Sequence, residues 1–438
     1  MKKISFRIKV DFVLLFEKGS RELEVATLLK SLLESKCYSF VILQQNFDIL
    51  SAWKYSPRIV LLPFCYQNRS NNLFLTLWRK SKFVNLSWEQ LFYSGNRLAK
   101  TPKGEFATKY VIHHSWSKSY TEYLIENAVP LNNIYSNGNL SLDLYNEPYR
   151  KIYDNPYDII NCNKTHKKIL FSENFNWAFY SDEMLLQMRN DGQKVSDINK
   201  MIEYNNNSFN IILNWLNVFL LNHKDYLLVF RPRPATSVDQ IKSKIASLGL
   251  VMPSNFLISK EGSVREWILY SDFVISTYST TLIEAVYAEK KSFMISPIIM
   301  PDVLKVNWHK YITKANNYEE FEKFLCGSED LIHLNNNFYS WISTSFFQNN
   351  TPINSLLNFL DTEINKKYSF SIPRKVLIYG NVSCKFRLPI YYTRIFYITL
   401  CSLIFFRKNK KSEYFQDHLM KENISGMMKK WNKLFFKK

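Results

Sequence analysis

Short apolar runs alternate with helical patterns along the first third of the chain. Residues 5–16 form a strand-like run, and residues 23–33 then repeat apolar positions at helical spacing. Two further apolar runs, residues 38–43 and 58–64, have the length of buried strands. Because strands that alternate with helices are typical of a parallel sheet with crossover helices, the pattern predicts a Rossmann-like α/β domain over residues 1–150.

A second series of alternating elements follows a polar, turn-prone stretch at residues 146–168, which we interpret as the linker between two domains. Strands are predicted at residues 168–171, 226–230, 256–258, 273–275 and 291–295, and helices at residues 199–221, 236–248, 264–270 and 280–288. This order predicts a second doubly wound α/β domain, over residues 165–362. Two such domains would face each other across a cleft.

Length and composition agree with this division. A chain of 438 residues is long enough for two domains, and its 46% hydrophobic and 22% charged residues exclude wholesale disorder and a multi-span membrane protein.

Six scattered cysteines, without the spacing of a metal site, indicate a reduced, cytoplasmic compartment. The N-terminus begins like a signal peptide, but Arg7, Lys9 and Asp11 interrupt its apolar core, so we interpret it as a buried strand.

The positive charge of the chain is concentrated at its C-terminal end. Residues 366–438 hold 17 Lys or Arg and three Asp or Glu, a net charge of +14 out of +19, which leaves +5 for the rest. A nucleic-acid enzyme usually spreads basic residues over its working surface, whereas a charged end on a balanced body favours attachment to something anionic. We therefore predict no nucleic-acid partner and a basic, aromatic membrane-associating tail over residues 363–438.

Two segments of this tail differ in character. Residues 395–406 are twelve uncharged residues, fewer than the about 20 that span a bilayer, so they are interpreted as an interfacial segment or a buried core helix. Residues 414–438 mix apolar and aromatic side chains with lysines, which is typical of a basic amphipathic helix in the membrane plane. The predicted location is peripheral, on the inner face of the cytoplasmic membrane; the alternative is a solvated charged tail.

A hydroxyl-rich turn follows the predicted strand at residues 273–275. Its polar residues are Ser276, Thr277, Ser279, Thr280 and Thr281. Hydroxyls and free backbone N–H groups at the start of a helix suit a phosphate or diphosphate. Glu284 lies in the first turns of the helix, where its carboxylate could accept hydrogen bonds from ribose hydroxyls. The alternative is that Ser279 or Thr280 only caps the helix.

Polar residues also follow two other strands of this predicted domain. Arg231 and Arg233 alternate with prolines after the strand at residues 226–230. This spacing suits two guanidinium groups that donate bidentate hydrogen bonds to phosphate oxygens. The alternative is a surface loop with an ion pair. Ser172 and Asn174 follow the strand at residues 168–171 and should face the same ligand, because ligands of open α/β sheets bind beyond the carboxyl ends of the strands.

The first domain contains candidates for a general base. Glu22 at the opening of a helix, Glu89, His113 or His114 could deprotonate an acceptor hydroxyl, and either histidine could instead bind phosphate. The alternative for Glu22 is a favourable contact with the helix dipole.

Three further residues of the first domain are candidates for binding the acceptor, namely Arg21, Trp88 and Trp116. The tryptophans could stack on sugar rings or only fill the core.

These motifs resemble known bacterial families. The second half is similar to the nucleotide-binding domain of GT-B glycosyltransferases and of the glycerophosphotransferases that build wall teichoic acids, in which a basic or His-Pro turn and a Ser/Thr-rich turn flank the nucleotide. Arg233 stands where some relatives have a histidine. In the first half, residues 21–23, 85–91, 111–117, 138–139 and 143–145 resemble the surface carbohydrate biosynthesis protein family, and the resemblance covers residues 8–330.

The resemblance implies a GT-B-like α/β fold of two Rossmann-like, doubly wound domains. We predict a glycosyltransferase that builds capsule, O-antigen or lipooligosaccharide by moving a sugar from a CMP- or UDP-type nucleotide donor to a lipid-linked or growing glycan. No Asp-x-Asp motif ends a strand, so we expect neither a metal nor a cofactor. The alternatives are transfer of a polyol phosphate from a CDP-glycerol-type donor and a non-catalytic role in a polysaccharide assembly complex.

Overall fold

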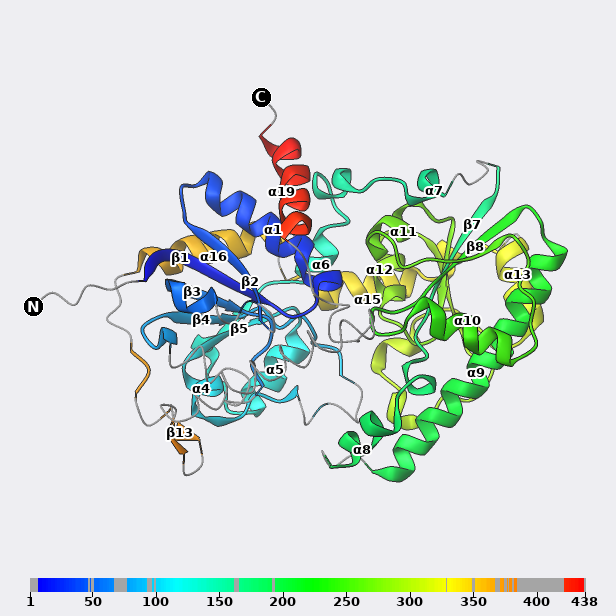
Figure 1. Cartoon of the computed structure of the whole chain (residues 1–438), viewed down its shortest axis with the longest axis horizontal. Coiled ribbons are helices and arrows are strands. Elements are labelled where there is room, and N and C mark those ends of the chain that lie inside the picture. The colour runs from blue at the N-terminus through cyan, green and yellow to red at the C-terminus, as the bar shows by residue number, and fades with distance from the viewer. Residues whose placement is uncertain are drawn as a thin grey trace, which may run out of the picture. The chain divides into compact units, whose positions relative to one another are not determined.

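A computed structural model of the chain describes residues 7–45, 48, 51–66, 77–92, 97, 100–160, 165–190, 194–327, 329–348, 351–366, 371–373, 376, 378–379, 382–383 and 421–436. The chain divides into two compact units. The first unit comprises Met1–Gln90, Ala99–Leu144 and Ser345–Lys438, and the second comprises Leu91–Leu98 and Tyr145–Thr344. Figure 1 shows their helices and strands.

The first unit is built on a six-stranded parallel sheet with the strand order β2-β1-β3-β4-β5-β6. Its strands are β1 (Ile8–Phe16), β2 (Phe40–Gln44), β3 (Tyr55–Leu62), β4 (Lys82–Asn85), β5 (Val111–Ser115) and β6 (Ile134–Ser136). Side chains from Phe12 to Phe16 in β1 are all fully buried, because helices cover both faces of the sheet. The strand order reverses at β1 and β3, and this reversal marks the doubly wound topology.

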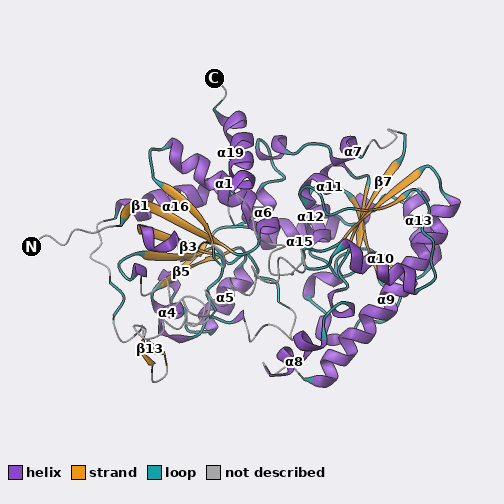
Figure 2. Ribbon diagram, viewed as in Figure 1, coloured by secondary structure: helices purple, strands orange, loops and turns teal. Residues whose placement is uncertain are grey.

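Helices pack on both faces of the first sheet, with α1 on one side and α4 and α5 on the other (Figures 1 and 2). The helices of this unit are α1 (Gly19–Ser35), α4 (Gly104–Lys109), α5 (Lys118–Glu126), α6 (Leu140–Asp143), α16 (Pro352–Asn365) and α19 (Lys421–Phe435). A short antiparallel pair, β13 (Ile378–Tyr379) and β14 (Val382–Ser383), belongs to the same unit.

The second unit has its own six-stranded parallel sheet, with the order β12-β11-β10-β7-β8-β9. The strands are β7 (Lys167–Ser172), β8 (Tyr226–Arg231), β9 (Phe256–Ile258), β10 (Phe273–Ser276), β11 (Lys291–Ile295) and β12 (Lys314–Ala315). Counted from β7, this is the 3-2-1-4-5-6 order of a dinucleotide-binding sheet, whose switch point lies between β7 and β10. The predicted doubly wound fold is confirmed for both units.

The long helix α9 supplies much of the core of the second unit. Its buried side chains recur at helical spacing, and Phe209, Leu213 and Leu216 lie in one apolar cluster with the sheet and with α10 and α13. The helices of this unit are α7 (Pro156–Ile159), α8 (Asp182–Asn190), α9 (Val195–Asn222), α10 (Val238–Ser247), α11 (Val264–Tyr270), α12 (Thr281–Tyr287), α13 (Tyr318–Cys326), α14 (Leu331–Leu334) and α15 (Asn336–Phe346), the last of which ends just inside the first unit.

The domain boundary predicted at residue 362 differs from the structure. The chain returns to the first unit at Ser345, so α16 belongs there and not to the second unit. The reason is local packing. Asn137 donates a hydrogen bond to the carbonyl of Pro352 at 2.9 Å, and the ring of Phe359 stacks on Tyr135 with their centroids 4.1 Å apart. The apolar stripe of α16 is therefore buried within the first unit.

The predicted amphipathic helix of the tail is present as α19, and it packs on α1. Trp431 is fully buried, and its indole N–H donates to Thr27 Oγ1 at 3.1 Å. Ser31 Oγ donates to Asn432 Oδ1 at 2.5 Å. Part of the apolar side of α19 therefore contacts protein, a contact that the prediction of an amphipathic helix in the membrane plane did not include.

The other predicted tail segment, residues 395–406, lies outside the described residues. Among the described helices, none is long and apolar enough to span a bilayer.

We predict that Trp431→Ala releases α19 from α1. Replacing a fully buried tryptophan by alanine removes packing worth about 3–5 kcal/mol, together with the hydrogen bond that the indole N–H donates to Thr27. Hydrogen exchange measured by mass spectrometry should show faster exchange of α19 amides and of the α1 turn around Thr27. The matched change Lys429→Ala, at an exposed position of the same helix, should leave exchange as in the wild type; equal rates in both variants would contradict the docking.

Candidate functional site

Three predicted donor-binding residues lie in one row at the carboxyl edge of the second sheet. Ser276 of β10 pairs with Ser172 of β7, and Ser172 pairs with Arg231 of β8. Because the three strands are parallel, the loops that follow these residues leave the sheet at the same edge. This edge includes the switch point between β7 and β10, where ligands of doubly wound sheets bind.

The hydroxyl groups beside this row form a cluster. Ser172 Oγ and Ser279 Oγ each donate to Thr281 Oγ1 at 3.0 Å, and the backbone N–H of Thr281 donates to Ser279 Oγ at 3.3 Å. Thr280 occupies the N-cap position of α12, but its side chain accepts no hydrogen bond from the backbone of the helix. The alternative that the Thr280 hydroxyl only caps the helix is therefore not supported. Ser276 Oγ donates to the carbonyl of Ser172.

One hydroxyl at this edge makes no hydrogen bond to any residue that the structure describes. Thr277 is fully buried, and its Oγ1 makes no hydrogen bond within the described part of the chain. A buried hydroxyl without a partner costs free energy, about 1–3 kcal/mol, unless a ligand supplies the missing bond. The neighbouring Tyr278 packs its ring against Tyr204, with the centroids 6.0 Å apart, and Tyr204 lines a cavity of ≈ 470 Å³ in the same unit.

The two predicted arginines have different surroundings. Arg231 Nη1 and Nη2 donate to the carbonyls of Glu261 and Gly262, each at 2.6 Å, so this guanidinium holds the loop before α11. The side chain of Arg233 is half-buried, and its guanidinium has no hydrogen bond or ion pair among the described residues. Of the two, Arg233 is therefore the one whose guanidinium can accept a phosphate without first giving up a contact.

Sequence reasoning assigned no role to Glu173, which lies between the predicted residues Ser172 and Asn174. Its buried carboxylate accepts hydrogen bonds from the backbone N–H of Phe175 and, at 3.0 Å, from that of Arg233. Burial raises the pKa of Glu173, although these two backbone bonds act in the opposite direction. The predicted residue Asn174 follows Glu173 directly, and its side chain is half-buried.

Two further residues hold Glu284, the residue predicted to bind ribose: Tyr145, noted in the sequence only as part of a family motif, and Arg265, which the sequence did not single out. Tyr145 donates its hydroxyl to Glu284 Oε2 at 2.8 Å, and Arg265 Nε lies 3.8 Å from the same oxygen. Arg265 is only 3% exposed. Burial and the Glu284 charge raise the pKa of Tyr145 well above its usual value, so its hydroxyl stays protonated and keeps donating.

In the first unit, Arg21 joins two of the predicted catalytic carboxylates. Glu22 is fully buried and accepts hydrogen bonds from the backbone N–H of Glu17, at 2.8 Å, and from Arg21 Nε, at 3.0 Å. Glu89 forms ion pairs with Arg21 and Lys100. The structure thus brings Arg21, Glu22 and Glu89 together near the carboxyl ends of β1 and β4.

The charges in this cluster set the protonation of both carboxylates. Burial acts to raise the pKa of Glu89, but the cations Arg21 and Lys100 outweigh it and hold the pKa at about 2. For Glu22, burial raises the pKa against the lowering effect of Arg21. Glu89 is ionised at neutral pH and its side chain is 40% exposed, whereas Glu22 is enclosed.

The two predicted histidines of β5 lie in the core and not in a ligand site. His113 is within hydrogen-bond distance of the Ala107 carbonyl and Asn85 Nδ2, at 2.7 and 3.1 Å, and both ring nitrogens are thereby satisfied. His114 contacts the Leu86 carbonyl at 3.0 Å. Burial lowers both pKa values to about 4, so both rings are neutral and neither is placed to serve as a base or to bind phosphate.

The two predicted sugar-stacking tryptophans are also buried. Trp116 is 7% exposed and packs edge-on against Phe346, with the ring centroids 6.1 Å apart. Trp88 is 5% exposed, and its indole nitrogen lacks a hydrogen-bond partner among the described residues. The alternative reading, that these rings fill the core, agrees better with their burial.

The described residues contain no group of three or more His, Cys, Asp or Glu side chains that could hold a metal ion. The expectation of a metal-independent reaction stays a prediction.

The two doubly wound units define a GT-B-like protein, with the candidate nucleotide site at the carboxyl edge of the second sheet. No family model and no curated protein sequence matches the chain. Several solved structures share its fold. The wall teichoic acid polymerase TagF superposes with a TM-score of 0.53 at 13% identity, over 83% of this chain and 91% of TagF.

Two epimerase-type structures are similar to the same degree. MnaA of S. aureus, solved with UDP, gives a TM-score of 0.52 at 12% identity, over 83% of this chain and all of MnaA (100%). A proposed UDP-N-acetylglucosamine 2-epimerase from Listeria monocytogenes gives 0.51 at 12% identity, over 83% of this chain and 99% of the other. At these identities the similarity establishes the fold, and it confirms the predicted GT-B-like class.

We predict that the first unit loses stability in acid because of His113 and His114. Burial lowers the pKa of both histidines to about 4 in the folded unit, from an ordinary value of 6.5, so both rings stay neutral until the pH falls to about 4. Between these values the unfolded chain binds protons that the folded unit does not, so stability falls as pH falls, by about 1 kcal/mol per pH unit for each histidine. Urea unfolding at several pH values measures this.

The variants His113→Gln and His114→Gln should each flatten that pH dependence, and His333→Gln, at an exposed position, should not. An unchanged slope in both core variants would contradict the neutral, buried state of the rings.

Proposed function

We propose that the chain is a glycosyltransferase of bacterial surface polysaccharide biosynthesis whose second unit holds a nucleotide-activated sugar. The observation that carries the proposal is that Arg233 follows β8 and Thr277 follows β10, at the same edge of one parallel sheet. Each offers a donor group that makes no hydrogen bond within the described part of the chain. A guanidinium presents several N–H donors to phosphate oxygens, and a diphosphate would satisfy both groups at once.

The carboxylate of Glu284 supports a nucleotide as the carrier of that diphosphate. Tyr145 and Arg265 fix its position from one side. An ionised carboxylate accepts two hydrogen bonds from the vicinal hydroxyls of a ribose. The fold agrees with this proposal, since MnaA was solved with UDP and TagF with CDPG. We therefore propose a UDP- or CDP-type donor.

In the transfer itself, an acceptor oxygen bonds to the anomeric carbon of the sugar while the bond from that carbon to the diphosphate breaks. Negative charge then builds on the leaving diphosphate, and the Arg233 guanidinium would stabilise it. For the acceptor, a lipid-linked or growing glycan, we propose the cluster of Arg21 and Glu89 in the first unit. Glu89 is the more accessible of its two carboxylates, and it would position the acceptor hydroxyl by accepting its hydrogen bond. Because Arg21 and Lys100 hold the pKa of Glu89 at about 2, the hydroxyl proton would leave on the departing diphosphate, which gains negative charge as its bond breaks.

A second candidate function is the transfer of a polyol phosphate from a CDP donor. The similarity to TagF, solved with CDPG, supports this second candidate. The same arginine and hydroxyls would bind the phosphates of a nucleotide sugar or of a CDP-polyol. The two functions differ in the donor that binds and turns over. A non-catalytic assembly protein would bind none.

We predict that Arg233→Ala weakens UDP or CDP binding by about 100-fold, because it removes a charge-assisted contact worth about 1.5–3 kcal/mol. Isothermal titration calorimetry of the full chain with UDP, CDP and GDP measures this, and the thermal unfolding midpoint without nucleotide should not change. Arg233→Lys should recover part of the affinity, since it restores the positive charge but not the planar set of N–H donors of a guanidinium.

The matched control is Arg189→Ala, which removes the same charge from an exposed position of the second unit. It should bind nucleotide like the wild type. Equal affinity for Arg233→Ala and the control would reject the phosphate assignment, and failure of the wild type to bind any nucleotide would favour the assembly role.

We also propose that the basic C-terminal region holds the protein on anionic membrane. In α19 the lysines Lys429 and Lys433 are exposed, whereas Trp431 faces α1. The attraction is then electrostatic, about 1 kcal/mol for each lysine near an anionic surface.

The double variant Lys429→Glu and Lys433→Glu should therefore sediment less with vesicles that contain phosphatidylglycerol, and added salt should reduce binding of the wild type. The control Lys118→Glu and Lys151→Glu makes the same charge change at exposed positions outside the tail. If tail and control variants sediment equally, the membrane proposal fails.

A further inference from the structure

A large cavity of ≈ 1110 Å³ lies in the first unit, away from the candidate acceptor cluster. Its wall includes Lys9 of β1, Arg58 of β3 and Lys82 of β4, and the C-terminal end of α16 closes it with Glu363 and Lys366. Lys9 and Lys82 stand at the amino ends of their strands. The acceptor cluster follows the carboxyl ends of β1 and β4, so the two sites occupy opposite edges of the sheet.

The cavity is strongly cationic. Six cationic side chains line it, and they face only two acidic ones, Asp11 and Glu363. The cations are Lys9, Arg58, Lys80, Lys82, Lys109 and Lys366. A wall with this excess of positive charge attracts multivalent anions, because the field of several like charges adds up in a concave site.

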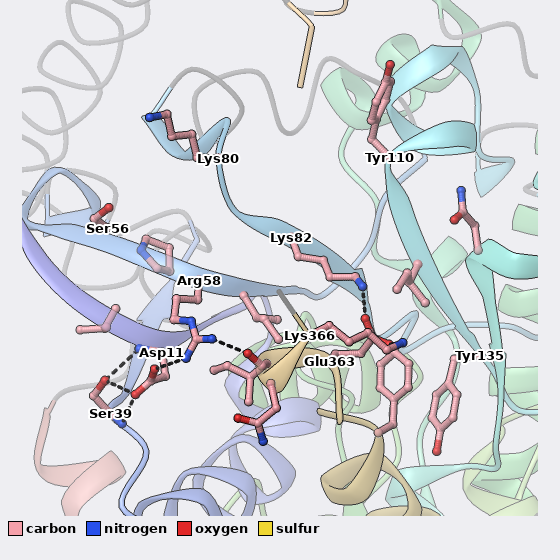
Figure 3. Close-up of a pocket in the computed structure, with 18 of the residues that line it drawn as sticks. Asp11, Ser39, Ser56, Arg58, Lys80, Lys82, Tyr110, Tyr135, Glu363 and Lys366 are labelled. Atoms are coloured by element: carbon pink, nitrogen blue, oxygen red, sulfur yellow. Dashed lines mark hydrogen bonds and ion pairs between the residues drawn. The ribbon is translucent and has the colours of Figure 1, made fainter. Parts of the chain in front are cut away.

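Both acidic side chains are already paired (Figure 3). Asp11 lies 3.2 Å from Arg58 and accepts a hydrogen bond from Ser39 Oγ at 2.8 Å. Glu363 forms ion pairs with both Lys82 and Lys366. These acids therefore do not neutralise the remaining lysines.

The remaining lysines are open to a ligand. Lys9 and Lys80 are exposed, and neither ammonium has an ion pair or hydrogen bond among the described residues. Among the described residues, Lys109 has only a 3.8 Å ion-pair contact with Glu105, and at this distance the carboxylate neutralises little of the lysine's charge. Burial and, second, the positive charge of the nearby Lys366 together lower the pKa of Lys82 to about 8.

We propose that this cavity is a second ligand site, which binds a phosphate or diphosphate group. Lysine ammonium groups act as compact point charges for phosphate oxygens, and several of them suit an anion that carries more than one negative charge. The cavity is larger than a bare phosphate requires. Tyr135, stacked on Phe359 with the centroids 4.1 Å apart, adds an aromatic wall for an organic group attached to the phosphate.

The phosphate group has two possible sources, a free anion in solution and the headgroup of a lipid. Both present the same chemistry to the lysines, so the experiment separates them by delivering phosphate in two forms. The soluble form is inorganic pyrophosphate. The lipid form is a vesicle that contains phosphatidic acid, whose phosphate is terminal, in a phosphatidylcholine background.

The pocket variant is the full chain with Lys9→Gln and Lys80→Gln, which keep polar side chains at two exposed positions and should not disturb the fold. The matched control is Lys103→Gln with Lys118→Gln, two exposed lysines of the same unit that do not line the cavity. Any pyrophosphate bound at the second unit, and any vesicle binding by the C-terminal region, is the same in both variants and cancels in the comparison.

We expect pyrophosphate to bind the pocket variant about tenfold more weakly than the control, because two attractive charges are gone. A second readout locates the site: pyrophosphate should slow acetylation of Lys9 and Lys80 in the wild type, measured by mass spectrometry, and should not slow that of Lys118. Loss of pyrophosphate binding alone assigns the site to a soluble anion, and loss of vesicle binding, alone or together with it, assigns a lipid headgroup. Equal binding of both probes by the two variants, with no protection of Lys9 or Lys80, overturns the proposal.

Discussion

The buried carboxylate of Glu173 ties together the two loops on which the candidate donor site depends. One oxygen accepts the backbone N–H of Phe175 after β7, and the other accepts that of Arg233 after β8. Neither bond uses the Arg233 guanidinium. The carboxylate therefore fixes the backbone of the arginine while its side chain remains available, and this is the condition that a phosphate ligand requires. These backbone donors offset part of the cost of burying Glu173, and the pKa of the carboxyl stays raised because burial is the larger effect.

Neighbouring polar side chains at the candidate donor site differ in whether other protein groups already hold them. Arg231 holds the loop before α11, and Arg233, two residues later, does not. Arg265 and Tyr145 hold Glu284, which itself stays partly exposed. A site built in this way keeps its geometry before a ligand arrives, so that less binding energy is lost in ordering the side chains.

The alternation of apolar runs was sufficient to predict the fold class, and in the second unit also most strands. Strands β9 and β11 begin and end where the pattern placed them, because their apolar residues stand between clear turns. The return of α16 to the first unit could not be predicted, since it depends on contacts such as that of Phe359 with Tyr135, far apart in the sequence.

The candidate site was predictable in its position but not in its detail. The residues at strand ends could be named, because parallel strands place their carboxyl ends at one edge. Burial could not be read from residue type, so His113 and Trp116 were given functional roles that their core positions do not support. Arg265 carried no signal at all, since a charged residue in the first turn of a helix is ordinarily exposed.

The most direct test of the account is a crystal structure of the full chain soaked with UDP and, separately, with CDP. The account predicts a nucleotide at the carboxyl edge of the second sheet, with its phosphates on the Arg233 guanidinium and the Thr277 hydroxyl and its ribose on Glu284. A nucleotide bound elsewhere, with these three side chains untouched, would contradict it.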